Sequence, residues 1–246
     1  MTKPIAQSYH PQSPNFYTGS GDVHVTKANL PHWNKKNIAC FVTFRLCDSL
    51  PKEKLVKLEE EREAWLKAKV DAQQRRSGVS PLQNEQRRSG VSPLQNEQRR
   101  SGVSPLLKLL NPEEIREYYS LFSEKIQNWL DQGIGSCYLR NDKCAKAVED
   151  ALWYFAGERY DLYAYVIMDN HVHILCMPRG ENKISNIVES IKKFTAHRIN
   201  DILNRNGKVW QKESFDTLVR NERHFISIIN YIRKNDVGRA WAYNMM

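Results

Sequence analysis

The sequence has no apolar run long enough to cross a membrane and no closely paired cysteines. Its longest apolar runs, residues 39–44 and 163–168, fall far short of the roughly 18 residues that a membrane span needs. The first 22 residues contain no apolar core that could act as a secretory signal, so we expect no export. The five cysteines are odd in number and form no CxxC pair, which favours free thiols in a reducing compartment. A membrane-spanning protein and a disulfide-stabilised protein are therefore excluded.

Acidic residues are fewer than basic ones: 28 Asp and Glu stand against 37 Lys and Arg, for a net charge of +9. Residues 183–246 carry +6 of this excess and residues 74–106 carry +4, which leaves the remainder close to neutral. A concentrated basic field suits a polyanion, and nucleic acid is the commonest one. A basic surface can equally serve solubility, so charge alone leaves both interpretations open.

The segment 74–106 contains the sequence QRRSGVSPL three times, at a period of 12 residues. Each copy offers one Val and one Leu beside Gly and Pro, which is too little apolar surface to stack into a core. Such a composition is typical of a flexible, solvated segment. We therefore expect one domain over residues 1–246 that carries a flexible tandem-repeat insertion at 74–106.

Around this insertion, hydrophobic periodicity predicts an α+β domain. Strands are predicted at residues 39–46, 160–168, 171–177 and 214–219. Helices are predicted at residues 51–70, 112–130, 142–155, 184–202 and 222–234. The first two helices should form a hairpin whose tip carries the insertion, and Asp169 with Asn170 suits a tight turn between two strands. This order predicts an antiparallel sheet covered by helices mainly on one face.

The tripeptide His171-Val172-His173 is the sharpest chemical feature of the chain. Side chains alternate along a strand, so both histidines project from one face and Val172 packs into the other. Two imidazoles a few ångströms apart form half of a divalent-metal site, although His-x-His also occurs by chance. Cys176 lies at odd spacing from both histidines, so we expect it to point into the core rather than complete a zinc site.

The last predicted helix offers a possible partner for these histidines. At 100° per residue, Tyr231 and Asn235 lie one turn apart and point the same way, beside the apolar face of the helix. A single tyrosine on a helix usually serves packing, so Tyr231 gains significance only from its neighbours in the sequence.

Three segments, in order, carry a resemblance: YAYVIMDNHVHILCMP, IKKFTAHRIN and VWQKESFDTLVRNERHFISIINYIRKNDV. Together they resemble the single-tyrosine HUH transposases, most of all the REP-associated tyrosine transposases. The resemblance spans about residues 39–242 apart from the repeat. It places the nucleophile at Tyr231 and an additional metal ligand at Asn235. Asp169 and Asp236 depart from the family pattern, because each stands where the family commonly has proline.

This resemblance implies a ferredoxin-like antiparallel sheet and a metal-dependent enzyme of DNA recombination. The implied reaction is nicking and strand transfer of single-stranded DNA at REP-like hairpins through a 5′-phosphotyrosine intermediate. Its cofactor would be Mg²⁺ or Mn²⁺, held by His171, His173 and Asn235. The implied setting is the bacterial cytoplasm at the nucleoid, with no membrane and no small-molecule substrate. A monomer is favoured and a dimer is possible.

Basic residues near the C-terminus are candidates for contacts with DNA. Those expected to bind phosphates are Lys192, Lys193, Arg220, Arg223, Arg233 and Lys234. Trp210 is a candidate for base stacking, and a place in the core is equally open to it. Two other functions remain open: a binder of structured single strands that lacks cleavage, and a zinc-stabilised domain that does not bind nucleic acid.

Overall fold

The computed structural model describes residues 9–19, 24–27, 31–76 and 104–243. The chain folds into two compact units. The sheet unit comprises Met1–Thr26, Pro31–Ser49 and Gly133–Met246, and the helical unit comprises Lys27–Leu30 and Leu50–Gln132. Within the described ranges, no helix combines the length and the apolar character that crossing a membrane requires.

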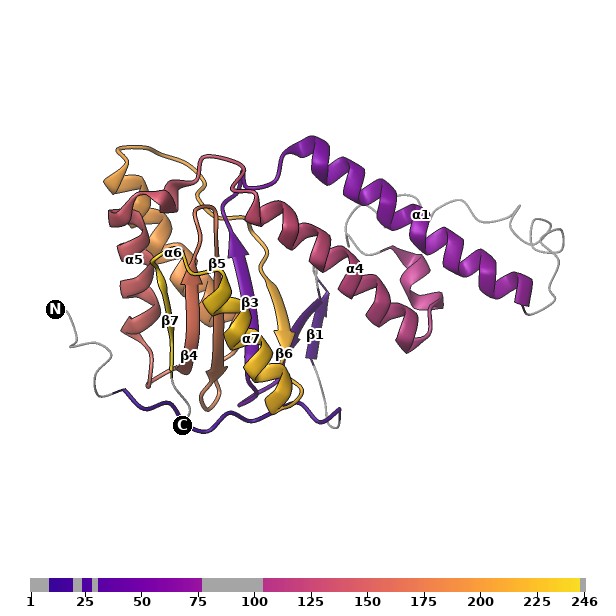
Figure 1. Cartoon of the computed structure of the whole chain (residues 1–246), viewed down its shortest axis with the longest axis horizontal. Helices are drawn as coiled ribbons and strands as arrows, with labels where there is room; N and C mark the ends of the chain where they lie inside the picture. The colour runs from indigo at the N-terminus through magenta and orange to yellow at the C-terminus, as the bar shows by residue number, and fades with distance from the viewer. Residues whose placement is uncertain (1–8, 20–23, 28–30, 77–103, 244–246) are drawn as a thin grey trace. The chain divides into compact units, whose positions relative to one another are not determined.

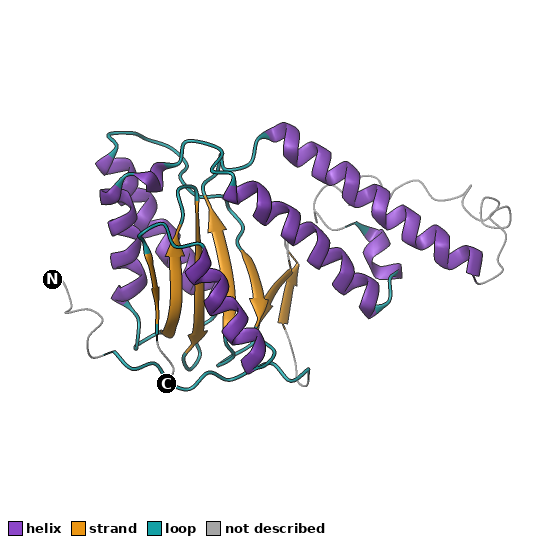
Figure 2. Cartoon of the chain, in the orientation of Figure 1, coloured by secondary structure: helices purple, strands orange, loops and turns teal. Residues whose placement is uncertain are grey.

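The sheet unit is built on an antiparallel sheet of five strands in the order β6-β3-β5-β4-β7 (Figures 1 and 2). Its strands are β3 (Cys40–Arg45), β4 (Tyr160–Ile167), β5 (His171–Pro178), β6 (Phe215–Leu218) and β7 (Ala240–Ala242). The first four confirm the predicted strands. Strand β7 was not predicted, because its three residues are too few to show an alternating pattern. A separate two-stranded sheet pairs β1 (His24–Lys27) with β2 (Pro31–Asn34).

Three helices accompany this sheet, each within one residue of its predicted bounds. They are α5 (Asp142–Tyr154), α6 (Ile184–Ile202) and α7 (Glu222–Lys234); a short 3-10 helix, η2 (Tyr138–Arg140), precedes α5. Chain order β3-α5-β4-β5-α6-β6 with sheet order β6-β3-β5-β4 is the ferredoxin-like arrangement, as expected. Helix α7 and strand β7 then follow as an addition to it.

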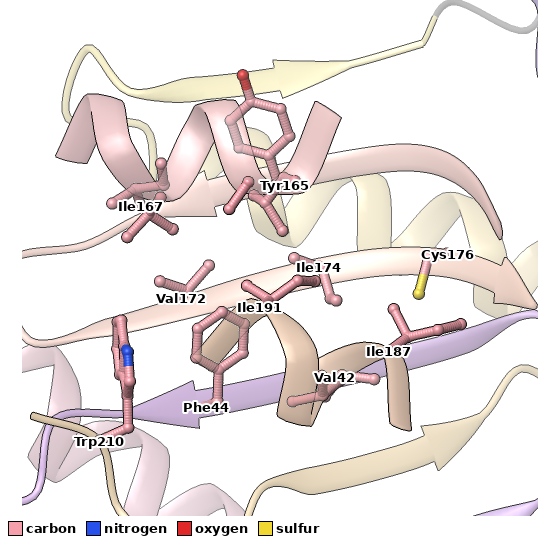
Figure 3. Close-up of a cluster of buried hydrophobic side chains, with 14 of the residues drawn as sticks. Val42, Phe44, Tyr165, Ile167, Val172, Ile174, Cys176, Ile187, Ile191 and Trp210 are labelled. Atoms are coloured by element: carbon pink, nitrogen blue, oxygen red, sulfur yellow. The ribbon is translucent and has the colours of Figure 1, made fainter. Parts of the chain in front are cut away.

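The two faces of the sheet are covered by different helices. Helices α5 and α6 cover one face, where Ile187 and Ile191 of α6 belong to the same buried cluster as Val172 and Ile174 of β5 (Figure 3). Helix α7 covers the other face, where Phe225 belongs to a second cluster. Two of the three helices therefore share a face, as predicted, and the helix that carries Tyr231 lies on the opposite one.

The helical unit is an antiparallel hairpin of α1 (Lys52–Arg76) and α4 (Pro112–Asp131), with η1 (Pro105–Leu109) before α4. Polar contacts show that the two helices are antiparallel. Lys54 donates to Gln132 and Lys69 donates to Glu117, with Nζ···O distances of 2.9 and 2.6 Å. Apolar side chains fill the space between the helices; the buried ones are Leu58, Leu66, Val70, Leu110, Tyr118 and Phe122. The predicted hairpin is therefore confirmed.

The predicted insertion at 74–106 falls mainly on residues 77–103, which lie outside the described residues. Its first residues instead end α1, which continues to Arg76, six residues beyond its predicted end. Its last residues, Pro105 and Leu106, belong to η1.

The chain leaves the sheet unit after β3 and re-enters it before η2 through a tight contact. The Ser136 amide donates to Asp48 Oδ2 at 2.9 Å, and the Ser136 hydroxyl donates to the same oxygen. Gly135 has φ +100°, and a Cβ there would lie 2.6 Å from the Asp48 carbonyl oxygen. Only glycine meets both demands, because the backbone is left-handed and the approach is close.

Candidate active site

Strand β5 presents His171 and His173 to the α7 face of the sheet. Register explains their surroundings, because Thr43 of β3 pairs with His173 and Arg45 pairs with His171. Directly opposed residues on antiparallel strands share a face, so Thr43 lies beside the His173 imidazole. Both imidazoles are 0% exposed, and Cys176 lies in the cluster on the α5 and α6 face (Figure 3). Cys176 therefore does not join the histidines, as predicted.

Each imidazole is oriented by a neighbour through its Nδ1 atom. Asn170 Nδ2 donates to the Ile134 carbonyl at 2.9 Å, so its Oδ1 is the atom that lies 2.7 Å from His171 Nδ1. His171 therefore carries a proton on Nδ1 and a lone pair on Nε2. Thr43 Oγ1 lies 2.7 Å from His173 Nδ1, and a hydroxyl can either donate or accept there. Such partners are what orients histidines that ligate metals.

The two Nε2 atoms lie 3.0 Å apart. Two lone pairs cannot face each other at this distance, so either a proton or a cation must lie between the nitrogens. Without a cation, His173 Nε2 donates to His171 Nε2 and Thr43 donates to His173 Nδ1. Two nitrogens that each lie about 2.1 Å from one ion, at a right angle, would be about 3.0 Å apart. The pair therefore fits two adjacent positions around a divalent cation.

Burial keeps both imidazoles neutral. It lowers the pKa of His171 to about 3, with the Asp169 carboxylate acting in the opposite direction. Burial likewise holds the pKa of His173 well below its ordinary value, and the neighbouring His171 acts in the same direction. A neutral imidazole is the form that ligates metal, and a group that resists protonation is a poor proton acceptor. These histidines are therefore suited to holding a cation rather than to general-base chemistry.

Helix α7 brings Tyr231 to the same place. Its hydroxyl lies 3.4 Å from His173 Nε2, and the centroids of the two rings are 5.3 Å apart. Phe41 of β3 is stacked against His173 at 5.3 Å and meets the Tyr231 ring edge-on at 6.0 Å. Asn221 caps the helix by accepting from the His224 amide, and Phe225, Ile228, Ile229 and Ile232 hold it on the sheet. The half-buried phenol thus faces the histidine pair of its own chain.

Asn235 follows Tyr231 by one turn and ends α7. Its side-chain amide donates to the Tyr231 carbonyl at 3.2 Å, which satisfies a carbonyl at the end of the helix. Its predicted role as a metal ligand stays a prediction.

The predicted DNA-binding residues divide between the two faces of the sheet. On or just before α7, exposed side chains are contributed by Arg220, Arg223, Arg233 and Lys234. Lys192 and Lys193 lie on α6, which covers the other face. Burial lowers the pKa of Lys192 to about 8, and its ammonium donates to the Lys212 carbonyl at 2.7 Å.

Trp210 occupies the core position, one of the two places that the sequence left open for it. The residue is 4% exposed, its ring meets Phe44 edge-on at 5.0 Å, and its indole NH donates to Thr195 at 2.9 Å. Figure 3 shows it in the buried cluster of the α5 and α6 face. Because the indole ring is buried and packed on Phe44, Trp210 belongs to the core and not to a base-binding surface.

The stretch that holds both histidines, Tyr231 and Asn235 also decides the comparison with known families. Residues 138–235 match the family described as "Transposase IS200 like". The resemblance inferred from the sequence is thereby confirmed for this stretch, which covers the sheet unit from η2 to the end of α7. No curated protein matches the chain.

A solved structure that is similar to the chain is described as "Structure of the REP associates tyrosine transposase bound to a REP hairpin". It shares 14% sequence identity, with a TM-score of 0.35, over 83% of this chain and 69% of that chain. The ferredoxin-like fold of the chain rests on the strand order β6-β3-β5-β4.

Three residues that orient the site were not predicted. Asn170 could have been suspected from its place beside His171 in the predicted turn. Thr43 and Phe41 could not, because they lie about 130 residues away and meet His173 only through the register of β3 on β5.

Proposed function

We propose that this protein nicks single-stranded DNA at hairpins and joins strands through a covalent bond to Tyr231. The observation that carries this proposal is the approach of the Tyr231 hydroxyl to within 3.4 Å of the paired histidines. The family match over residues 138–235 supports a transposase-type reaction. Tyr231 faces the histidine pair of its own chain, which supports a monomer as the working unit, and the proposed setting is the bacterial nucleoid.

In the proposed step, the Tyr231 oxygen forms a bond to the phosphorus of a DNA phosphodiester, and the bond from phosphorus to the 3′ oxygen breaks. The phenolic proton is released, and the 3′ oxygen takes up a proton. The products are a 5′-phosphotyrosine and a free 3′ hydroxyl, and the reverse step joins a new 3′ end. A phenol with a pKa of about 10 is about 0.1% ionised at pH 7, a deficit of about 4 kcal/mol that the site must offset.

His171 and His173 would hold a divalent cation through their Nε2 atoms, with Asn235 as the proposed additional ligand. When bound, such a cation polarises the phosphate and offsets the charge of the transition state. Imidazole ligands favour Mn²⁺ more than Mg²⁺, so Mn²⁺ is the better test ion in vitro. Asn170 and Thr43 keep the two rings aimed at one point, so no ring has to reorient during the reaction.

The exposed basic residues of α7 would bind the phosphates that flank the reacting one. Arg223 and Arg233 belong to the helix that carries Tyr231, so DNA phosphates bound by them lie on the same side of the sheet as the phenol. REP-like hairpins with an adjoining single strand are the proposed ligand.

The test uses labelled hairpin oligonucleotides that flank the gene, with Mn²⁺, analysed on a denaturing gel. Wild type should form a covalent DNA adduct, whereas Tyr231→Phe should bind the hairpin and form none. Phenylalanine is the matched variant, because it keeps the ring contacts with Phe41 and His173 and removes only the nucleophilic oxygen. An adduct formed by Tyr231→Phe would remove Tyr231 from the reaction.

A second function, hairpin binding without cleavage, is favoured by one observation. Both imidazoles are 0% exposed, so a phosphodiester reaches them only if the residues that cover them move. Under this alternative, wild type and Tyr231→Phe bind hairpins equally and neither forms an adduct. The same gel therefore decides between the two functions.

A further inference from the structure

The chain that follows α7 is shaped by Asp236. Its Oδ1 accepts from the Gly238 amide at 2.8 Å and from the Arg239 amide at 3.0 Å. Gly238 has φ +84°, which a residue with a side chain rarely adopts. This turn reverses the chain directly after the helix and delivers Arg239 to the start of β7.

Arg239 is bound to the β4–β5 turn through both its backbone and its side chain. Its carbonyl accepts from the Ile167 amide at 3.0 Å, and its Nη2 donates to Asp169 Oδ1 at 2.6 Å. Its Nη1 also donates to the Leu139 carbonyl. The guanidinium is mostly enclosed, with its side chain 18% exposed. Enclosed, charge-assisted hydrogen bonds of this kind fix geometry better than ion pairs at the surface do.

The same carboxylate also binds a second arginine. Arg140 of η2 donates to Asp169 Oδ2 from Nε at 3.1 Å and from Nη2 at 3.0 Å. Burial alone would raise the pKa of Asp169, but the hydrogen bonds from Arg239 and then Arg140 outweigh it and lower the pKa. The Arg140 side chain is 70% exposed and belongs to the segment before α5, so it does not connect Asp169 to α7.

Resting on the function proposed above, we propose that Asp169 and Arg239 are positioning residues that hold the end of α7 against the β4–β5 turn. Asp169 lies two residues before His171, and Arg239 lies eight residues after Tyr231. Their contact therefore ties the segment that carries the histidines to the segment that carries the phenol. It sets the separation between the Tyr231 hydroxyl and the histidine pair within one chain.

Asp169 and Asp236, the two residues that depart from the family pattern, both contribute to the placement of Arg239. Asp236 shapes the turn that presents Arg239, and Asp169 accepts the guanidinium. Neither side chain touches the reacting atoms, so both are positioning residues. A misplacement of about 1 Å can lower a rate about 100-fold, which makes the position of the phenol the quantity to test.

The closing experiment compares Arg239→Ala with Arg140→Ala, since each removes one arginine from the same carboxylate. Single-turnover adduct formation in Mn²⁺ and hairpin Kd are measured for both variants. Arg239→Ala should lower the rate about 10- to 100-fold and change the Kd less than about twofold. Arg140→Ala should change both less than about threefold, because it leaves α7 tied to the turn. Arg239→Lys should recover part of the rate, since its ammonium can still reach Asp169.

A double variant and an exchange measurement complete the test. Asp169→Ala combined with Arg239→Ala should be about as slow as the slower single variant, because each single variant already removes the contact between Asp169 and Arg239. Amide hydrogen exchange at Asn235, whose NH bonds to the Tyr231 carbonyl, should accelerate in Arg239→Ala and not in Arg140→Ala. Equal losses of rate in the two arginine variants, or unchanged exchange in Arg239→Ala, would overturn the inference. If wild type binds the hairpin and forms no adduct, the proposed function is overturned instead. Hydrogen exchange still tests whether the contact between Asp169 and Arg239 holds the end of α7.

Discussion

The two faces of strand β5 hold different kinds of side chain within one run of residues. Toward α5 and α6, Val172 and Ile174 pack among aliphatic and aromatic neighbours. Toward α7, His171 and His173 use both nitrogens of each ring in polar contacts. Burying a Val or Ile side chain contributes about 1.5–3 kcal/mol, whereas a buried imidazole costs free energy unless it is hydrogen-bonded. Over residues 171–174, one face therefore supplies apolar packing and the other supplies two oriented imidazoles.

The alternation of a strand is what lets these two tasks coexist. A ligand on the α7 face can be placed without loss of the core, because its neighbours along the chain point the other way. We therefore expect substitutions of His171 or His173 to affect the chemistry, and substitutions of Val172 or Ile174 to affect folding.

The largest effect is expected on the α7 face. His171→Ala removes one of the two proposed Nε2 ligands, so adduct formation in Mn²⁺ should fall at least about 100-fold while hairpin binding stays within about twofold. Single-turnover gels and fluorescence anisotropy measure the two quantities. Cleavage at the wild-type rate would exclude the histidine pair from the mechanism.

The matched control is Ile174→Ala, one residue beyond the pair and on the other face. Removing this buried side chain should lower the free energy of unfolding by about 2–5 kcal/mol, as measured by urea denaturation. At low temperature, where the variant remains folded, its adduct rate should equal that of wild type. A rate that falls with Ile174→Ala in the folded state would show that the two faces are coupled.

A smaller effect distinguishes the basic residues of the two faces. Replacing Arg223 and Arg233 of α7 by Ala should weaken hairpin binding and lower the slope of log K against log salt by about one per lost phosphate contact. Lys193→Ala, on α6, should leave both the affinity and the slope unchanged. The reverse result would place the DNA on the α5 and α6 face and away from Tyr231.

The smallest effect is expected from the repeat. Deleting residues 75–98 removes two whole periods and joins Gln74 to Arg99, which restores the local sequence QRR. Thermal stability, hairpin affinity and adduct rate should all remain near wild type, because each repeat carries too few apolar residues to build a core. A large loss in any of them would assign the repeat a role in folding or binding.

Much of the sheet unit was predictable from local pattern. The alternating run around His171 fixed a strand and its two faces, and the periodicity of Phe225, Ile228 and Ile232 fixed the buried face of α7. Strand β7 was not predicted, because its few residues form a strand only by pairing with β4. The burial of Trp210 depends on its packing against Phe44, which no local sequence pattern reveals.

The candidate functional residues were predictable from the sequence, whereas the residues that orient them were not. His171, His173 and Tyr231 followed from motif and resemblance, whereas Thr43 and Arg239 act through contacts across 130 and 70 residues of chain. Such contacts depend on register and on turn geometry, which emerge only when the whole sheet is assembled.

The contact between Asp48 and Ser136 has a consequence for how this chain can vary. It holds the exit and the re-entry of the helical unit within hydrogen-bonding distance, so the sheet closes in the same way whatever lies between them. The entropic cost of a longer excursion grows only with the logarithm of its length, by about 0.6 kcal/mol for each doubling. Units of 12 residues can therefore be gained or lost there over generations while strand order and site geometry stay constant.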